Sequence, residues 1–199
     1  MNYLAHLHIA EQTQSSFLGN FLGDFIKGNP EGRFNEKIES GIRLHRFVDS
    51  YTDHHPLIKS LKPLFLGEYR RFSPIALDMF WDHCLAKHWL DFNKQPLSSF
   101  TLQAQATINS EKKELVQPLP ERFEKVSQLV WKGQWFEHYR EIKNIDFALQ
   151  RIASRRTRMA PLVGTFTTLA EHYDLLTDAF FELYPDILRV AIIETKKET

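Results

Sequence analysis

Cysteine is almost absent from the sequence. Cys84 is the single copy, which excludes a framework of internal disulfides and fits a reducing compartment. No apolar run approaches the roughly 18 residues of a membrane-spanning helix. The first ten residues contain neither Lys nor Arg, so they make a poor signal peptide. From these absences we expect a cytoplasmic protein without a membrane partner.

An excess of charge of either sign is also lacking. The 25 basic and 25 acidic residues give a formal net charge of zero, which argues against a nucleic-acid partner. Glycine and proline are few, and no run rich in Val, Ile and Thr alternates with a period of two. Because repeats, low-complexity tracts and long linkers are missing too, we predict one all-α domain over residues 1–199.

Apolar residues recur at steps of three and four along most of the chain, which predicts helices. Proline residues bound several of them, and Pro185 is expected to break the last helical segment in two. Ser15 or Ser16 is a plausible cap for the second helix. The expected helices cover residues 2–10, 15–27, 35–54, 56–65, 74–92, 97–116, 120–131, 133–142, 144–157, 165–183 and 185–197.

Three of the expected helices carry carboxylates within an otherwise apolar stripe. Burying an unpaired carboxylate is very costly, so such residues must either pair with a neighbouring side chain or bind a ligand. Asp78 and Asp82 lie one helical turn apart, where like charges repel unless a cation lies between them or one is protonated. The candidate metal ligands on these stripes are Asp24, His45, Asp49, Asp78 and Asp82.

The mixture of carboxylates and imidazoles, with His83 close by on the same helix as two of the acids, suits Mn²⁺, Fe²⁺ or Mg²⁺. A hard divalent ion in such a cluster commonly activates water against a phosphoryl group. For any one of these residues a structural role is the alternative. Arg43 and Arg46 are available partners for Asp49, and His45 taken alone suits a hydrogen-bonded core position.

Near the C-terminal third, Arg151, Arg155, Arg156 and Arg158 form a positive cluster with no acid between them. Guanidinium groups bind phosphates and carboxylates through paired hydrogen bonds, so the cluster suits a phosphate or an acidic protein. A solvated helix end is the structural alternative, because cations are favoured at helix C-termini.

Six segments stand in a recognisable order: MNYLAHLHIA, GNFLGDFIKGNP, GIRLHRFVDSYTD, SPIALDMFWDHCLAKHW, ASRRTR, and EHYD with FFELYP. Together they resemble the acyl carrier protein phosphodiesterase family over almost the whole chain. The resemblance implies a bacterial, cytoplasmic, all-α enzyme that hydrolyses the phosphodiester between 4′-phosphopantetheine and a serine of acyl carrier protein. It further implies dependence on a metal, preferentially Mn²⁺, and divergence from the HD-type phosphohydrolases. The chain lacks their adjacent His-Asp doublet and has only the reversed pair Asp82-His83, so ligands are not transferred by motif.

The resulting hypothesis is metal-assisted hydrolysis of holo-acyl carrier protein, in which one or two ions lower the pKa of the attacking water. His83 or His6 supplies a proton to the leaving serine oxygen, Arg46 neutralises the phosphate, and the arginine cluster docks the acidic carrier protein. Two alternatives stay open: an HD-like hydrolase of nucleotides or other small phosphoesters, and a non-catalytic helical protein that binds, for instance, haem. The sequence leaves the identity and number of the metal ions and the oligomeric state open.

Overall fold

The computed structural model describes residues 1–198, and this part of the chain contains helices but no strand, which confirms the predicted all-α fold. Short 3₁₀ segments, η1 (Lys62–Leu64), η2 (Gly67–Phe72) and η3 (Thr157–Gly164), connect some of the helices. The α-helices are α1 (Tyr3–Thr13), α2 (Phe17–Leu22), α3 (Glu36–His54), α4 (Pro56–Leu61), α5 (Ser73–Lys87), α6 (Trp89–Phe92), α7 (Leu97–Lys113), α8 (Glu121–Lys132), α9 (Trp135–His138), α10 (Ile142–Ala153), α11 (Thr165–Glu171) and α12 (Tyr173–Glu198).

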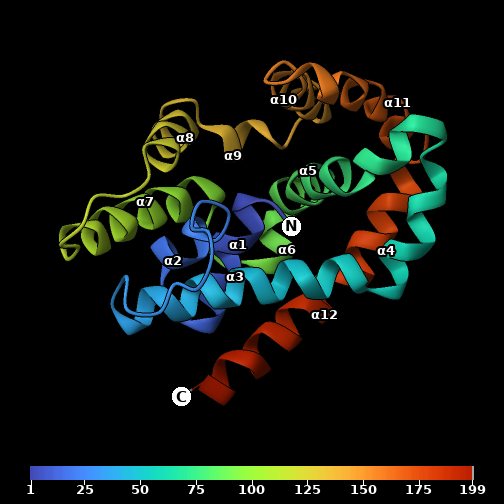
Figure 1. The fold of residues 1–199 in the computed structure, drawn as a ribbon. Helices are drawn as coiled ribbons and strands as arrows, with labels where there is room; N and C mark the ends of the chain where they lie inside the picture. Colours follow the sequence, from blue (N-terminus) through green and yellow to red (C-terminus); the bar gives the residue numbers. More distant parts are fainter. Residues whose placement is uncertain (199) are drawn as a thin grey trace.

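The centre of the molecule is α1, which packs against α2, α5 and α12 (Figure 1). Every residue from Leu4 to Ala10 is buried, including the two histidines of this segment. Figure 1 shows the N-terminus beside α5 in the middle of the fold, whereas the C-terminus lies at the outer end of α12. Met1 is buried in the core, while Asn2 and Tyr3 are partly exposed.

The closest helix pair is formed by α2 and α3. A Cβ atom at Gly19 would lie 2.4 Å from the carbonyl oxygen of Ile38 and 3.0 Å from Cα of Gly41, so glycine is required at this crossing. Both helices have side-chain caps, because Ser16 accepts from the amide of Gly19 and Asn35 accepts from the amide of Ile38. The cap of α2 is thus one of the two serines expected from the sequence.

Several predicted helices differ from the structure near their ends, and two of these carry candidate metal ligands. The helix expected over 15–27 stops at Leu22 and passes into a turn, in which the amides of Phe25 and Ile26 both bond to the Leu22 carbonyl. Residues after this turn are tied to α3 by Arg46, which donates to the carbonyl of Ile26. The helix expected over 74–92 is interrupted at His88 and continues as α6.

The break predicted at Pro185 is wrong: α12 runs through this proline without interruption. Proline removes one backbone hydrogen bond, but the apolar face continues on both sides of it, with Leu183 and Tyr184 before and Ile187 after fully buried. Packing therefore keeps the helix in one piece, and the interruption falls earlier, at His172. None of the helices within residues 1–198 is long and apolar enough to cross a membrane.

Candidate metal site

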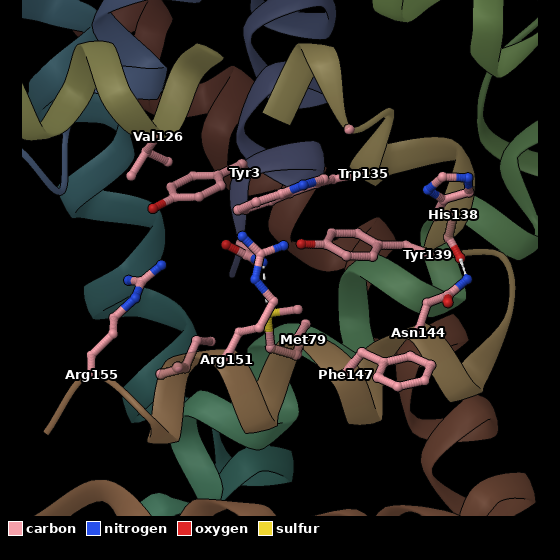
Figure 2. Close-up of a pocket in the computed structure, with 14 residues that line it drawn as sticks. Tyr3, Met79, Val126, Trp135, His138, Tyr139, Asn144, Phe147, Arg151 and Arg155 are labelled. Atoms are coloured by element: carbon pink, nitrogen blue, oxygen red, sulfur yellow. Dashed lines mark hydrogen bonds between the residues drawn. The ribbon is translucent and has the colours of Figure 1, made fainter. Parts of the chain in front are cut away.

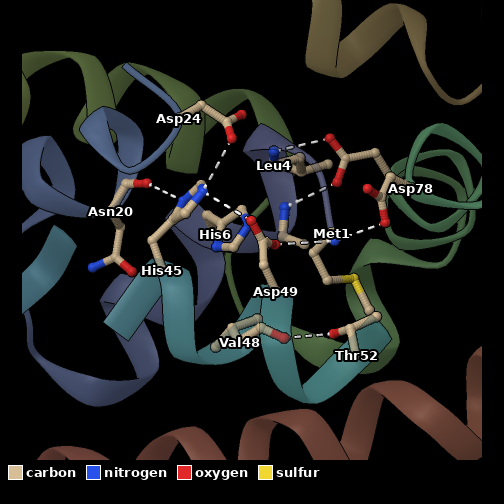
Figure 3. A network of polar contacts seen from close by, with 12 residues as sticks. Met1, Leu4, His6, Asn20, Asp24, His45, Val48, Asp49, Thr52 and Asp78 are labelled. Atoms are coloured by element: carbon tan, nitrogen blue, oxygen red, sulfur yellow. Dashed lines mark hydrogen bonds and ion pairs between the residues drawn. The ribbon is translucent and has the colours of Figure 1, made fainter. Parts of the chain in front are cut away.

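Three ligand-type side chains meet between α1 and α3 (Figure 3). His6 comes from α1, while His45 and Asp49 lie one turn apart on α3. One ligand atom from each of the three lies within 4.8 Å of the others. Asp49 bridges the two rings, because its Oδ1 is 3.0 Å from Nε2 of His6 and its Oδ2 is 3.1 Å from Nε2 of His45. We call these three residues the triad.

Packing of α2 on α3 fixes the orientation of His45. Its Nδ1 lies 2.7 Å from the carbonyl oxygen of Asn20 and donates to it, so Nε2 faces the carboxylates. Gly23 provides the space for this ring, since a Cβ atom there would lie 2.1 Å from it. Histidines that bind metals commonly donate their other ring N–H to a backbone carbonyl in this way.

The outward-facing nitrogen of His45 is poorly satisfied. Its Nε2 is buried and has no hydrogen-bond partner among residues 1–198, although oxygens of Asp49 and Asp24 lie 3.1 Å and 3.5 Å away. The two carboxylates favour a positive charge at this nitrogen, and a divalent ion in place of the proton would meet the same ring nitrogen and carboxylate oxygens. Two imidazoles and carboxylate oxygens are also a common donor set for divalent ions. The triad therefore fits a divalent metal ion.

The two histidines of the triad stack with ring centroids 3.7 Å apart, yet their pKa values shift in opposite directions. Burial, together with the neighbouring His45, lowers the pKa of His6 to about 4. Burial would lower the pKa of His45 as well, but Asp24 and Asp49 outweigh it and raise this pKa to about 9. A bound metal ion would replace the proton on His45, so its affinity should rise with pH.

The pKa of Asp49 lies well below its usual range. Burial acts to raise it, but His6, His45 and the α-amino group of Met1 outweigh burial and keep the carboxylate ionised. The side chains of Asp24 and Asp49 are 51% and 35% exposed, whereas both histidines are buried. The site thus opens to solvent along Asp49 of the triad and the neighbouring Asp24.

Asp78 reaches the triad only through the N-terminus. The α-amino nitrogen of Met1 lies 2.8 Å from Oδ1 of Asp78 and 3.3 Å from Oδ1 of Asp49. Burial would lower the pKa of this amino group, but the two carboxylates raise it to about 11. The resulting ammonium places a positive charge between Asp49 and Asp78, both of which the sequence analysis offers as metal ligands.

Asp82 caps the start of α1. Its Oδ2 accepts from the amide of Leu4 at 2.9 Å and its Oδ1 from the amide of Ala5 at 3.0 Å. The first amides of a helix have no partner within the helix, and a negative charge there also favours the helix dipole. Burial raises the pKa of Asp82 to about 7, against the effect of the two amides. Both of its oxygens are thus already engaged.

His83 is equally well satisfied on the other side of α5. Its Nδ1 lies 2.7 Å from the carbonyl oxygen of Tyr139, and its Nε2 lies 2.8 Å from the hydroxyl of Tyr173. Burial lowers its pKa to about 4, although the carbonyl of Tyr139 opposes the shift. A neutral imidazole with both nitrogens bonded has no proton to give unless it changes partners.

The arginine candidates lie apart from the triad centre. The guanidinium of Arg46, which the sequence suggests for the phosphate, donates instead to the carbonyl oxygens of Ile26 and Gly28. In the cluster between α10 and η3 all four arginines are exposed, and Arg151 packs over the ring of Trp135 at 5.0 Å. The cluster remains a candidate for binding an anionic partner.

Comparison with known proteins identifies relatives over nearly the whole chain. The family model described as acyl carrier protein phosphodiesterase matches residues 1–187. The chain belongs to this family.

Curated relatives agree with the family assignment. Proteins named acyl carrier protein phosphodiesterase from Pectobacterium atrosepticum and Yersinia pestis are each 42% identical over 192 residues, which is 96% of this chain and 97% of theirs. One from Escherichia coli O6:H1 is 38% identical over the same shares. No solved structure matches.

Within this phosphodiesterase family member, the structure brings Asp24, His45 and Asp49 together, as the stripes suggested, and adds His6 to them. Sequence reasoning offered His6 only as a proton donor. The signal for it was present, because a histidine interrupts the apolar N-terminal segment, but no local pattern indicates that α1 lies against this part of α3. The metal-binding roles of Asp78 and Asp82 and the catalytic role of His83 stay predictions.

Proposed function

We propose that this chain hydrolyses the phosphodiester that links 4′-phosphopantetheine to a serine of acyl carrier protein, and that a divalent ion bound by the triad is required. The observation that carries the proposal is the buried Nε2 of His45, which faces two carboxylates without a hydrogen bond in a member of this family. The names of the relatives supply the substrate, and the triad supplies a place for the chemistry.

His6, His45 and Asp49 would hold the ion, with Asp24 at the open side. When bound, a divalent ion lowers the pKa of a water molecule and stabilises charge on a phosphate. Mn²⁺ is our choice, with Mg²⁺ or Fe²⁺ as alternatives, since the mixed nitrogen and oxygen donors are harder than a typical zinc site and too rich in nitrogen for a calcium site.

The residues of the chain contribute orientation and charge. His6 is neutral, with its Nε2 3.0 Å from Oδ1 of Asp49, and His45 is aligned by its bond to the Asn20 carbonyl. The half-exposed carboxylate of Asp24 can accept a hydrogen bond from the attacking water and orient it toward phosphorus. The exposed Arg156 and Arg158 would attract the acidic carrier protein and speed its association.

The test measures release of 4′-phosphopantetheine from holo-acyl carrier protein, monitored as a decrease in the mass of the carrier protein. We expect turnover that stops after chelation and returns with Mn²⁺ more readily than with Ca²⁺. Nucleotides and small phosphomonoesters serve as competing substrates. Turnover of nucleotides without release from holo-carrier protein would overturn the proposal in favour of another phosphoester hydrolase, and full activity in metal-free protein would remove the metal from it.

A further inference from the structure

A cavity of about 280 Å³ lies between the start of α1 and the helices α8 to α10. Burial and then the charge of Asp24 raise the pKa of Tyr3, which lines the cavity, so the cavity lies near the carboxylate beside the triad. Tyr3 precedes His6 by one turn of α1. Asn2, which also lines the cavity, follows Met1, whose α-amino group contacts Asp49. We call this space the α10 cavity. Two of its lining residues, Asn2 and Tyr3, are neighbours in sequence of groups at the triad, but the proposed hydrolysis does not yet use the cavity.

The lining of the α10 cavity is mostly apolar with a few polar groups (Figure 2). Met79, Val126 and Phe147 supply apolar surface, and Trp135 supplies a large ring. Such a surface with few convergent polar groups is typical of a pocket for a small organic group. The polar groups that line it belong to Asn2, Tyr3, His138, Tyr139, Asn144, Arg151 and Arg155.

Two tyrosine hydroxyls are available in the cavity. Neither Tyr3 nor Tyr139 has a hydrogen-bond partner for its hydroxyl within residues 1–198, and Figure 2 shows the Tyr139 hydroxyl pointing toward the end of Arg151. A simple hydrocarbon chain would leave these groups unpaired at a cost in free energy. The cavity therefore suits an occupant in which amide or hydroxyl groups alternate with apolar ones.

Positive charge lies near both the cavity and Asp24, because Asp24, Arg122 and Arg155 all act on the hydroxyl of Tyr3. Arg155 lines both the α10 cavity and a neighbouring hollow that contains Arg122 and Lys125. The guanidinium of Arg122 lies 5.3 Å from the ring centre of Phe25, the residue after Asp24. An anionic group that moves between the triad and the cavity thus passes cationic side chains, which suits a phosphate.

We propose that the α10 cavity binds the pantetheine arm of the substrate, so that the phosphate at the end of the arm lies at the open side of the triad. The inference rests on the proposed function and deepens it. The arm combines two amides and a hydroxyl with a geminal dimethyl group, and this alternation matches the lining. With the arm in the cavity, Arg151 and Arg155 contact the prosthetic group, and Arg156 and Arg158 are left to bind the carrier protein.

Ala148 on α10 offers the sharpest test, because it lines the cavity and is only partly buried. Ala148→Phe should fill part of the space. The matched control is Ala106→Phe, the same exchange at an exposed position of α7 outside the cavity. Two quantities are measured for both variants and the wild type: calorimetric binding of 4′-phosphopantetheine, and the ratio of kcat/KM for holo-carrier protein to kcat/KM for bis(p-nitrophenyl) phosphate, a diester without the arm.

For Ala148→Phe we expect binding of 4′-phosphopantetheine to weaken at least tenfold and the ratio to fall at least tenfold, mainly through KM, with no change in Ala106→Phe. Unchanged binding and ratio in Ala148→Phe would overturn the inference, as would equal losses on both diesters. A wild type that releases nothing from holo-carrier protein defeats the proposed function, and the calorimetric comparison alone then decides the inference. Should Ala148→Phe fail to fold, Tyr139→Phe replaces it, with an expected weakening of about threefold to tenfold for one lost hydrogen bond.

Discussion

The triad and the Asp82–His83 pair have similar composition and opposite surroundings. Each places a carboxylate beside a buried imidazole, but the Asp82 carboxylate is fully buried, whereas the Asp49 side chain is 35% exposed. Both oxygens of Asp82 accept backbone amides and both nitrogens of His83 have partners, whereas Nε2 of His45 and Nδ1 of His6 are buried without hydrogen bonds within residues 1–198. A buried carboxylate or imidazole is therefore available to a ligand only where neighbouring segments leave its atoms without hydrogen bonds. The apolar helix stripe that carries the residue does not decide this.

The largest expected effect on activity comes from neutralising the carboxylate of the triad, compared with the same change at Asp82. Asp49→Asn should lower kcat/KM for holo-carrier protein by about 1,000-fold or more, because a metal ligand acts directly on the reaction. Asp82→Asn is the matched control, and below its melting temperature it should retain turnover within about tenfold of wild type. A folded but inactive Asp82→Asn, or an active Asp49→Asn, would reverse the assignment of the two groups.

Asp82→Asn should lower the stability of the fold, although it has little effect on activity. The amide that replaces one oxygen cannot accept from the α1 backbone, so one buried N–H loses its partner. We expect the free energy of unfolding in urea to fall by about 1–3 kcal/mol. This differs from the effect expected of two repelling acids, whose neutralisation would leave stability unchanged or higher. An unchanged or raised free energy of unfolding would show that the cap on α1 contributes nothing.

The acid side of the stability curve tests whether His83 is held neutral in the fold. Burial lowers the pKa of His83 from its usual 6.5 to about 4, so below pH 6.5 the unfolded chain binds a proton that the folded chain does not bind. Stability should therefore be lost as pH falls from 6.5 toward 4, by about 2 kcal/mol at pH 5 for one such residue.

His83→Gln removes this titrating group, so it should show a flatter dependence of unfolding free energy on pH over the same range. His45 has the opposite sign, because its raised pKa adds stability below pH 6.5 that is lost as pH rises toward 9. Identical acid slopes in His83→Gln and wild type would mean that this imidazole is not held neutral in the fold.

A smaller effect is expected outside both groups, in the exposed arginines that do not line the α10 cavity. Charge reversal at Arg156 and Arg158 together should raise KM for holo-carrier protein by a few-fold and weaken the salt dependence of association, since such residues act mainly during encounter. Hydrolysis of bis(p-nitrophenyl) phosphate is the control. A loss of equal size on that diester would place these arginines at the chemistry.

Most helices were predictable because their signals are local. The 35–54 helix, for example, agrees with α3 to within one residue at its start, and Ser16 caps α2. The error at Pro185 arose because tertiary packing outweighs one lost hydrogen bond. Local signals also found Asp24, His45 and Asp49, since each interrupts an apolar stripe.

The partners of these side chains were not predictable from spacing. That Asp82 meets the amides of α1, and that Met1 lies between Asp49 and Asp78, depends on contacts between segments more than 40 residues apart in sequence. His6 joined the triad for the same reason, because its neighbours belong to α3. Periodicity identifies a buried polar residue, but only the fold tells whether it is already satisfied.

The most direct test of the metal site is a calorimetric titration of Mn²⁺ into metal-free wild type, Asp49→Asn and Asp82→Asn. The account predicts that Asp82→Asn binds Mn²⁺ within about threefold of wild type, whereas Asp49→Asn binds it at least about 100-fold more weakly, since a direct ligand matters at least as much as the groups that orient ligands. Retained binding in Asp49→Asn together with lost binding in Asp82→Asn would contradict the account and move the metal ion to α5.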